Sequence, residues 1–227
     1  MKKFFFDFFR WLAIIQAYPV QWLFYKRKTY YEEGANRRMW KKGGALIISN
    51  HYSFFDYPLT MFLVLPRKLN VVSSEIPYKN KFLSFGMNFF GGIQANRLTK
   101  DMSFMNKSAE VIRRGQLVQI YPEGRITTDG NLQPFKRSYI VIAHRANAPI
   151  IPIVTDGNYG FFKRTRLMVG KEIYVSDYIN STGPMPTKDE LVYVDEIIHN
   201  KVQSMLDQLN ELKDNSKKKN KRKGKNK

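Results

Sequence analysis

The chain has 227 residues, of which 43% are hydrophobic, which is enough for one sizeable core and gives no sign of a second domain. It contains no cysteine, which excludes a disulfide framework and catalysis by a thiolate. The net charge of +19 favours polyanionic partners, namely nucleic acid, anionic lipid headgroups or phosphorylated substrates.

The first 28 residues are typical of a helical segment associated with a membrane. Residues 4–25 hold 17 apolar or aromatic side chains, and as a helix they would extend about 33 Å. Basic residues flank both ends of this run, and polar residues interrupt it. The pattern therefore favours a segment that lies in the membrane interface, or dips in and returns to the same side, with Pro19 as a candidate bend. A secretory signal peptide and a buried core helix are the alternatives.

A buried strand and the loop after it carry the most informative motif. The apolar run 45–48 predicts a short strand, and residues 59–65 predict a helix. Between these elements lie His51 and Asp56, separated by four residues. A histidine at the end of a buried strand can act as a general base that a nearby carboxylate holds in place. Alternatively, Asp56 is the N-cap of the following helix and His51 is an ordinary polar residue.

Two later loops combine glycine with candidate anion-binding side chains. Gly91 and Gly92 precede a short expected strand, 93–95, that would deliver Arg97; a turn with a surface arginine is the alternative. The expected strand 117–121 runs into residues 122–130, which include Glu123, Gly124 and Arg125. Ligands of open α/β sheets bind at such strand ends, and an arginine fork suits a phosphate.

The remaining elements complete an alternating pattern of strands and helices. We expect strands at residues 69–73, 148–154 and 166–175, and helices at 101–114, 138–146 and 187–212. Pro149 and Pro152 favour an edge or irregular position for the strand 148–154. Strands separated by helices predict one α/β domain over residues 29–212, with a mostly parallel central sheet flanked by helices.

Residues 213–227 form a lysine-rich tail with nine basic residues, one acidic residue and no apolar side chain. This composition predicts disorder and an electrostatic contact with anionic membrane lipids. Nucleic acid is the less favoured partner because no motif with stacking aromatic residues accompanies the tail. The two ends of the chain together predict a membrane-associated protein, at the cytoplasmic face of the cell membrane.

Four stretches, in order, resemble the sequence blocks of the glycerophospholipid acyltransferase family, which includes 1-acylglycerol-3-phosphate acyltransferases. The first is His51-x4-Asp56, preceded by Asn50. The other three are Gly91-Gly92-Ile93-x-x-x-Arg97, Tyr121-Pro122-Glu123-Gly124 and Ala148-Pro149-Ile150-Ile151-Pro152-Ile153. No single block is specific, whereas the four together and in order are.

The resemblance implies transfer of a fatty acyl group from a thioester of coenzyme A or acyl carrier protein to the hydroxyl of a lysophospholipid. It implies that His51 is the general base and that Asp56 orients it. Arg97 and Arg125 would bind the acceptor phosphate, in a substrate site that includes Glu123 and Gly124. Glu123 would order this site by pairing with an arginine. Neither a metal nor a bound cofactor is needed.

The third block departs from the usual family pattern, which continues with threonine and then arginine after Glu-Gly. Here Arg125 and Ile126 follow, as in bacterial acyltransferases that act on 2-acylglycerophosphoethanolamine. We expect 1-acylglycerol 3-phosphate as the acceptor and phosphatidate as the product. Lysophosphatidylethanolamine and glycerol 3-phosphate remain alternative acceptors, and a non-catalytic lipid-binding protein of the same fold is the alternative from another class.

Overall fold

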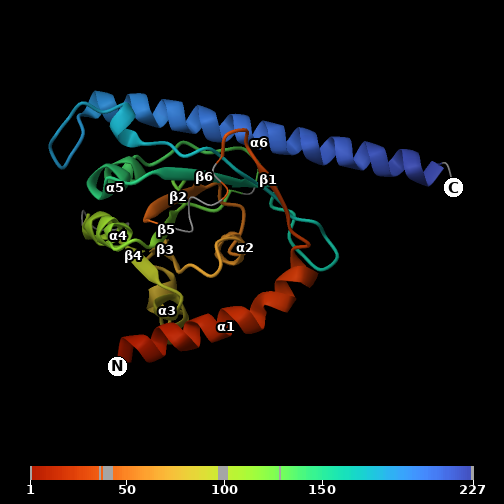
Figure 1. Cartoon of the computed structure of the whole chain (residues 1–227), viewed down its shortest axis with the longest axis horizontal. Helices are drawn as coiled ribbons and strands as arrows, with labels where there is room; N and C mark the ends of the chain where they lie inside the picture. The colour runs from red at the N-terminus through yellow and green to blue at the C-terminus, as the bar shows by residue number, and fades with distance from the viewer. Residues whose placement is uncertain (1, 36, 38–42, 97–101, 128, 226–227) are drawn as a thin grey trace.

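A seven-stranded sheet forms the centre of the computed structural model, which describes residues 2–35, 37, 43–96, 102–127 and 129–225 (Figure 1). The strand order is β1-β7-β6-β2-β5-β3-β4, and every pair is parallel except β6 with β7. The strands are β1 Lys28–Tyr31, β2 Ala45–Ser49, β3 Leu69–Ser74, β4 Gly92–Ala95, β5 Leu117–Ile120, β6 Ile150–Thr155 and β7 Arg166–Val169. The prediction of a mostly parallel α/β sheet is confirmed.

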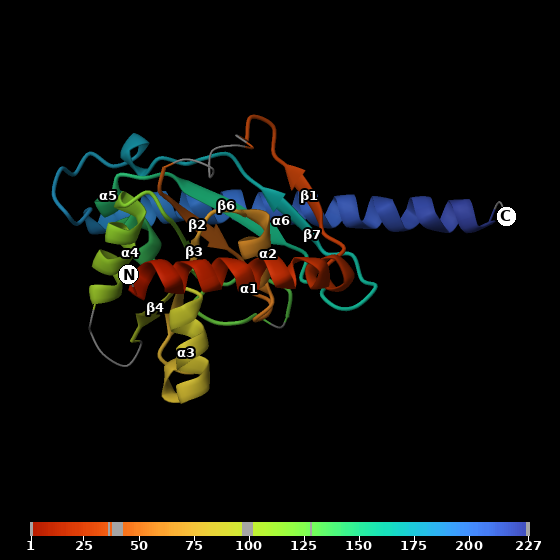
Figure 2. The same ribbon diagram turned by 60° about the horizontal axis from the view of Figure 1, so that its bottom comes forward.

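Helices cover both faces of the sheet (Figures 1 and 2). They are α1 Lys2–Phe24, α2 Asp56–Leu63, α3 Lys81–Phe89, α4 Ser103–Arg113, α5 Ser138–Ala146 and α6 Lys188–Lys225, with single 3-10 turns at Pro77–Lys79 and Val175–Asp177. Leu46 and Ile48 of β2 join a core with α4, α5 and α6, whereas Ala45 and Ile47 join a second core with α1 and α2. This alternation follows from the two-residue period of a strand.

Strand β6 lies inside the sheet, between β2 and β7, so the edge position predicted from its prolines is wrong. All six of its residues are buried. Pro152 lies opposite Gly170, just beyond the last residue of β7, and its carbonyl accepts a hydrogen bond from the Gly170 N–H at 2.8 Å. The proline is tolerated because the pairing with β7 ends at this point.

Helix α1 buries one face against the second core and exposes the other. Its buried residues are Arg10, Ile14 and Gln21, followed by Tyr25 just after the helix. Its exposed apolar residues are Phe8, Phe9, Trp11, Leu12, Ile15, Tyr18, Trp22 and Leu23. In the part of the chain that the structure describes, no helix has both the length and the apolar character needed to cross a membrane.

Helix α6 continues to Lys225 and includes most of the tail for which the sequence predicts disorder. Contacts with the domain reach Ser216, whose hydroxyl accepts a hydrogen bond from the Arg166 guanidinium at 2.8 Å. Lysine has a high helix propensity, so its run extends a helix that packing has already nucleated. Figure 1 shows this end of α6 projecting beyond the sheet.

Candidate active site

His51 lies in the loop that follows the carboxyl end of β2, beside the equivalent end of β6. The buried amide of Asn50 connects these two strands: it donates to the Thr155 carbonyl at 3.0 Å and accepts from the Thr155 N–H at 2.9 Å. Asn50 therefore fixes the backbone from which His51 projects.

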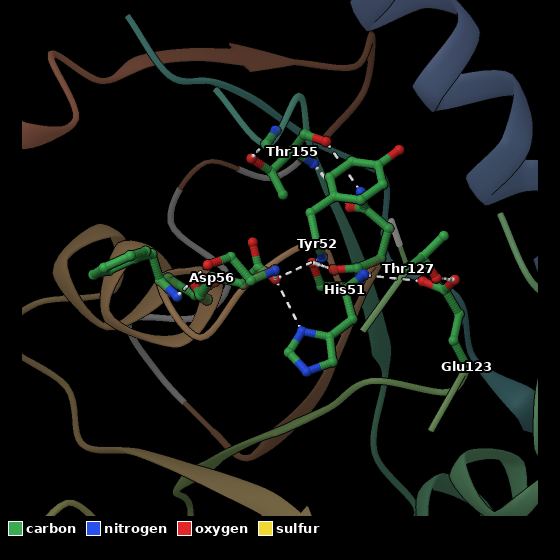
Figure 3. Close-up of polar contacts among 12 residues, drawn as sticks. His51, Tyr52, Asp56, Glu123, Thr127 and Thr155 are labelled. Carbon is green, nitrogen blue, oxygen red and sulfur yellow. Dashed lines mark hydrogen bonds and ion pairs between the residues drawn. The ribbon is translucent and has the colours of Figure 1, made fainter. Parts of the chain in front are cut away.

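His51 and Asp56 form a hydrogen-bonded pair, as the motif predicts. The His51 Nδ1 and Asp56 Oδ2 atoms are 2.9 Å apart, and the Asp56 side chain is only 1% exposed (Figure 3). The same oxygen accepts from the backbone N–H groups of Tyr52 and Ser53, each at 2.8 Å. Asp56 begins α2 but does not cap it, since Phe55 occupies the cap position and the carboxylate faces back toward the histidine loop.

The second oxygen of Asp56 accepts a hydrogen bond from the hydroxyl of Tyr159, which lies in the loop between β6 and β7. Burial raises the pKa of Tyr159, and the nearby Asp56 carboxylate raises it further. The phenol therefore stays protonated and keeps donating. Tyr159 lies 103 positions after Asp56 in the chain and belongs to no local motif, so the sequence does not predict this contact.

The ring of Tyr121 stacks on the His51 imidazole, with 3.9 Å between centroids and an interplanar angle of 16°. Tyr121 follows β5, the neighbour of β2 in the sheet. Stacking on one face and the Asp56 bond at Nδ1 hold the imidazole in one orientation. Since an ionised carboxylate only accepts, Nδ1 carries the proton and Nε2 is left as the acceptor.

Glu123 holds the histidine loop, and its partners among the described residues are backbone and hydroxyl donors; its pairing with an arginine stays a prediction. One carboxylate oxygen accepts from the His51 backbone N–H at 2.9 Å. The other accepts from the Thr127 hydroxyl at 2.7 Å and from the Gln133 N–H at 3.0 Å. Backbone and hydroxyl donors thus satisfy a carboxylate that is 5% exposed.

Two of the other predicted substrate-binding residues, Gly124 and Arg125, directly follow Glu123 in the chain. Gly124 has φ +70°, and a Cβ there would lie 2.9 Å from the Lys136 side chain. Arg125 is exposed and its guanidinium donates to the Gln133 side chain. Arg97 lies outside the described residues. Strands β5 and β3 separate β4 from β2. Strand β4 ends two residues before Arg97 and borders a polar cavity of about 810 Å³ with Lys79 and Lys107 in its wall.

Within the described residues, no group of three or more histidine, aspartate and glutamate side chains is placed to hold a metal ion. The described side chains of this site offer a histidine and a carboxylate that orients it.

Comparison with known families shows to which protein family the chain belongs. The family model described as Acyltransferase matches residues 26–156, more than half of the chain. The chain belongs to the acyltransferase family. The matched residues include the His51–Asp56 loop, Glu123 and β6, so the resemblance predicted from the four blocks is confirmed.

Relatives of this acyltransferase carry a consistent name. The 1-acyl-sn-glycerol-3-phosphate acyltransferase of Bacillus subtilis is 21% identical over 174 residues, which are 74% of this chain and 84% of the relative. The human 1-acyl-sn-glycerol-3-phosphate acyltransferase beta is 29% identical over 130 residues, covering 56% of this chain and 46% of the relative. The chain thus spans most of the bacterial relative but under half of the human one.

The crystal structure of the 1-acyl-sn-glycerophosphate acyltransferase PlsC from Thermotoga maritima has the same fold. It superimposes with a TM-score of 0.57 and 18% sequence identity, over 87% of this chain and 78% of that chain.

Proposed function

We propose that this acyltransferase moves a fatty acyl group from an acyl thioester to the free hydroxyl of 1-acylglycerol 3-phosphate, which gives phosphatidate. The observation that carries the proposal is the buried Asp56 carboxylate bonded to Nδ1 of His51, because it leaves Nε2 as a base. The names of the relatives from Bacillus subtilis and human support this acceptor.

His51 would remove the acceptor proton as the hydroxyl oxygen attacks the thioester carbonyl. The new C–O bond forms, the C–S bond breaks, and the proton held on Nε2 passes to the departing thiolate. Asp56 would stabilise the imidazolium formed between these steps. Such general base catalysis accelerates a reaction by about 10²–10⁴-fold. The nucleophile belongs to the substrate, so the chain needs neither a catalytic serine nor a cysteine.

The backbone N–H groups nearest the imidazole are not free to stabilise the oxyanion. Those of His51, Tyr52 and Ser53 are already bonded to Glu123 and Asp56. The donors for the tetrahedral intermediate must therefore come from another part of the site.

The donor would be acyl-CoA or acylated carrier protein, and Arg97 and Arg125 would hold the acceptor phosphate. Arg125 is exposed and lies two residues after Glu123, whose carboxylate holds the His51 backbone. This placement is compatible with a phosphate close to the base.

We also propose that the protein works at the cytoplasmic face of the cell membrane. The apolar, largely aromatic face of α1 supports this location, because such side chains favour the interface between water and lipid. The lysine-rich end of α6 would add electrostatic attraction to anionic lipids, about 1 kcal/mol for each basic residue near the surface.

An acceptor panel tests the proposed reaction. The purified full chain is supplied with a long-chain acyl-CoA and, in turn, lysophosphatidate, lysophosphatidylethanolamine or glycerol 3-phosphate, and thiol release and product mass are recorded. We expect the highest kcat/KM with lysophosphatidate. A preference for another acceptor would overturn the substrate assignment, and no turnover with any acceptor or with acyl carrier protein as donor would favour a lipid-binding protein.

A further inference from the structure

The loop between β6 and β7 presents two phenylalanine side chains to solvent. Phe161 is 62% exposed and Phe162 is 81% exposed. Lys163 and Arg164, which follow them, are exposed cations. Aromatic rings beside basic side chains are typical of a segment at the surface of an anionic bilayer.

Backbone hydrogen bonds fasten this loop to the C-terminal end of α1. The N–H groups of Gly160 and Phe162 donate to the carbonyl oxygens of Phe24 and Leu23, at 3.3 and 3.4 Å. The ring of Phe161 meets the ring of Phe24 edge to face, with 5.4 Å between centroids. The loop therefore continues the exposed apolar surface of α1.

The backbone of Phe162 is held in an unfavourable conformation. Its φ is +66°, in the left-handed region that a bulky side chain rarely adopts. Its ring stays outside the core, with the Lys26 ammonium 5.1 Å from the ring centroid. Burial inside the protein does not account for a strained backbone at an exposed aromatic residue, which points to a role for the ring outside the fold.

The same loop reaches the catalytic pair. Tyr159, two residues before Phe161, donates its hydroxyl to Asp56. Phe54, inside the His51–Asp56 loop, is 77% exposed. Exposed aromatic side chains therefore border the catalytic loop as well as the end of α1.

We propose that residues 157–164 form a lipid-contact loop that inserts Phe161 and Phe162 into the surface of an anionic bilayer, beside the C-terminal end of α1. The inference rests on the membrane location proposed above. In this position the loop would hold His51 close to the surface in which a lysophospholipid resides. The acceptor hydroxyl could then reach the base without leaving the bilayer.

A double substitution in the full chain tests the loop. Phe161→Asn with Phe162→Asn removes both rings, and asparagine tolerates the left-handed backbone at position 162. The matched control, Tyr178→Asn with Tyr193→Asn, also removes two exposed aromatic side chains. Tyr193 belongs to α6, which lies on the face of the sheet opposite to α1. Both proteins are sedimented with vesicles of phosphatidylcholine and phosphatidylglycerol in a 7:3 ratio, a composition of about 30% anionic lipid.

We expect the loop variant to lose about tenfold in vesicle partitioning, as removal of apolar area from a lipid contact requires, and the control to match the wild type. The loop variant should also turn over vesicle-borne lysophosphatidate more slowly, while its turnover in detergent micelles stays within about twofold. Equal partitioning of the loop variant and the wild type would overturn the proposal.

Labelling provides a second test that does not depend on the double variant. Because the chain has no cysteine, Phe162→Cys and Tyr193→Cys each offer one site for an environment-sensitive fluorophore. The label at position 162 should shift to shorter wavelength when vesicles are added, and the label at 193 should not. No shift at 162, or a shift caused by acyl carrier protein or by self-association but not by vesicles, would overturn the proposal.

The vesicle measurements need no turnover, so they separate this inference from the proposed reaction. Vesicle binding that depends on the loop, in a protein without acyl transfer, would support the loop and contradict the reaction. Acyl transfer by the wild type, together with unchanged vesicle partitioning of the loop variant, would support the reaction and contradict the loop.

Discussion

The Asp56 carboxylate accepts four hydrogen bonds from described residues, and together they define how the His51–Asp56 pair is held. One oxygen binds His51 Nδ1 and two backbone N–H groups, and the other binds the Tyr159 hydroxyl. These bonds hold the carboxylate in place beside His51 Nδ1 and leave Nε2 as the nitrogen that serves as the base in the proposed reaction.

Tyr159 is a positioning residue, and Tyr159→Phe tests its effect on Asp56. A hydrogen bond to a charged group contributes about 1.5–3 kcal/mol. If the substitution removes about half of this free energy from the stabilisation of the transition state, kcat falls about tenfold while KM changes little. The measurement is steady-state kinetics with acyl-CoA and lysophosphatidate.

The control for this substitution is Tyr25→Phe. The Tyr25 hydroxyl donates to the Phe55 carbonyl at 3.0 Å, and its ring lies 5.7 Å from that of Tyr159, so it shares the aromatic cluster without touching Asp56. Similar kcat values for Tyr159→Phe and the control would show that the hydrogen bond from Tyr159 to Asp56 does not affect turnover.

Among single residues, the sequence predicts those with a local pattern and misses those that act across the fold. His51 and Asp56 are five positions apart, and their spacing alone brings them together. Tyr159 and Tyr121 reach the pair only because β6 and β5 flank β2. Glu123 is correctly placed near the site, but its partners are backbone N–H groups and a hydroxyl, which no charge pattern reveals.

At the scale of elements, continuous apolar runs give the most accurate predictions. The strand expected at 45–48 appears as β2, Ala45–Ser49, and the helix expected at 138–146 has those bounds. Strand β1, Lys28–Tyr31, was missed because it has a half-exposed pattern and follows the long apolar helix. It forms only through pairing with β7, far along the chain.

The start of α6 is a capping box that makes a prediction about pH. The Glu190 carboxylate accepts from the Thr187 N–H at 2.8 Å, and the Glu190 N–H donates to the Thr187 hydroxyl at 3.3 Å. A hydrogen bond from the Ser181 hydroxyl, followed by the one from Thr187, lowers the pKa of Glu190 to about 2. Because this value lies below that of an unfolded chain, the charged carboxylate stabilises the fold above about pH 4.3 and loses this effect as the pH falls toward 2.

Glu190→Gln should therefore lower the urea midpoint at pH 7, and the difference from the wild type should shrink between about pH 4.3 and 2. Glu196→Gln, on an exposed residue of the same helix, should leave the midpoint nearly unchanged at each pH. If the urea midpoint of Glu190→Gln stays below that of the wild type by the same amount down to pH 2, ionisation of Glu190 does not stabilise the fold.

On the scale of the whole molecule, the protein places its catalytic loop and its exposed aromatic side chains around the same region. Helix α1 and the loop 157–164 meet at Phe24, and the Phe55 ring lies 4.8 Å from Phe24. The sequence predicts a helical segment over residues 1–28, and α1 is a helix over most of it, Lys2–Phe24. The continuation of its surface onto the catalytic loop depends on tertiary packing and could not be predicted.

Substitutions on α1 test the proposed membrane location. Trp11, Ile15 and Trp22 lie on one exposed face, so their replacement by glutamine leaves the buried residues Ile14 and Tyr25 in place. We expect the triple variant to shift from the membrane fraction to the soluble fraction of cells, since each exposed aromatic or aliphatic side chain contributes apolar area to the contact. An unchanged distribution, with the wild-type circular dichroism spectrum, would count against α1 as a membrane contact.

Phosphatidate formation by His51→Ala is the most direct measurement of the central claim, that His51 is the base for acyl transfer. We predict a loss of at least about 10²–10⁴-fold in turnover, with lysophosphatidate and acyl-CoA as substrates. His144→Ala is the matched control, because His144 lies on α5 and bonds the Gly183 carbonyl away from the His51–Asp56 loop, and it should retain wild-type turnover. Turnover of folded His51→Ala equal to that of the control would contradict the account.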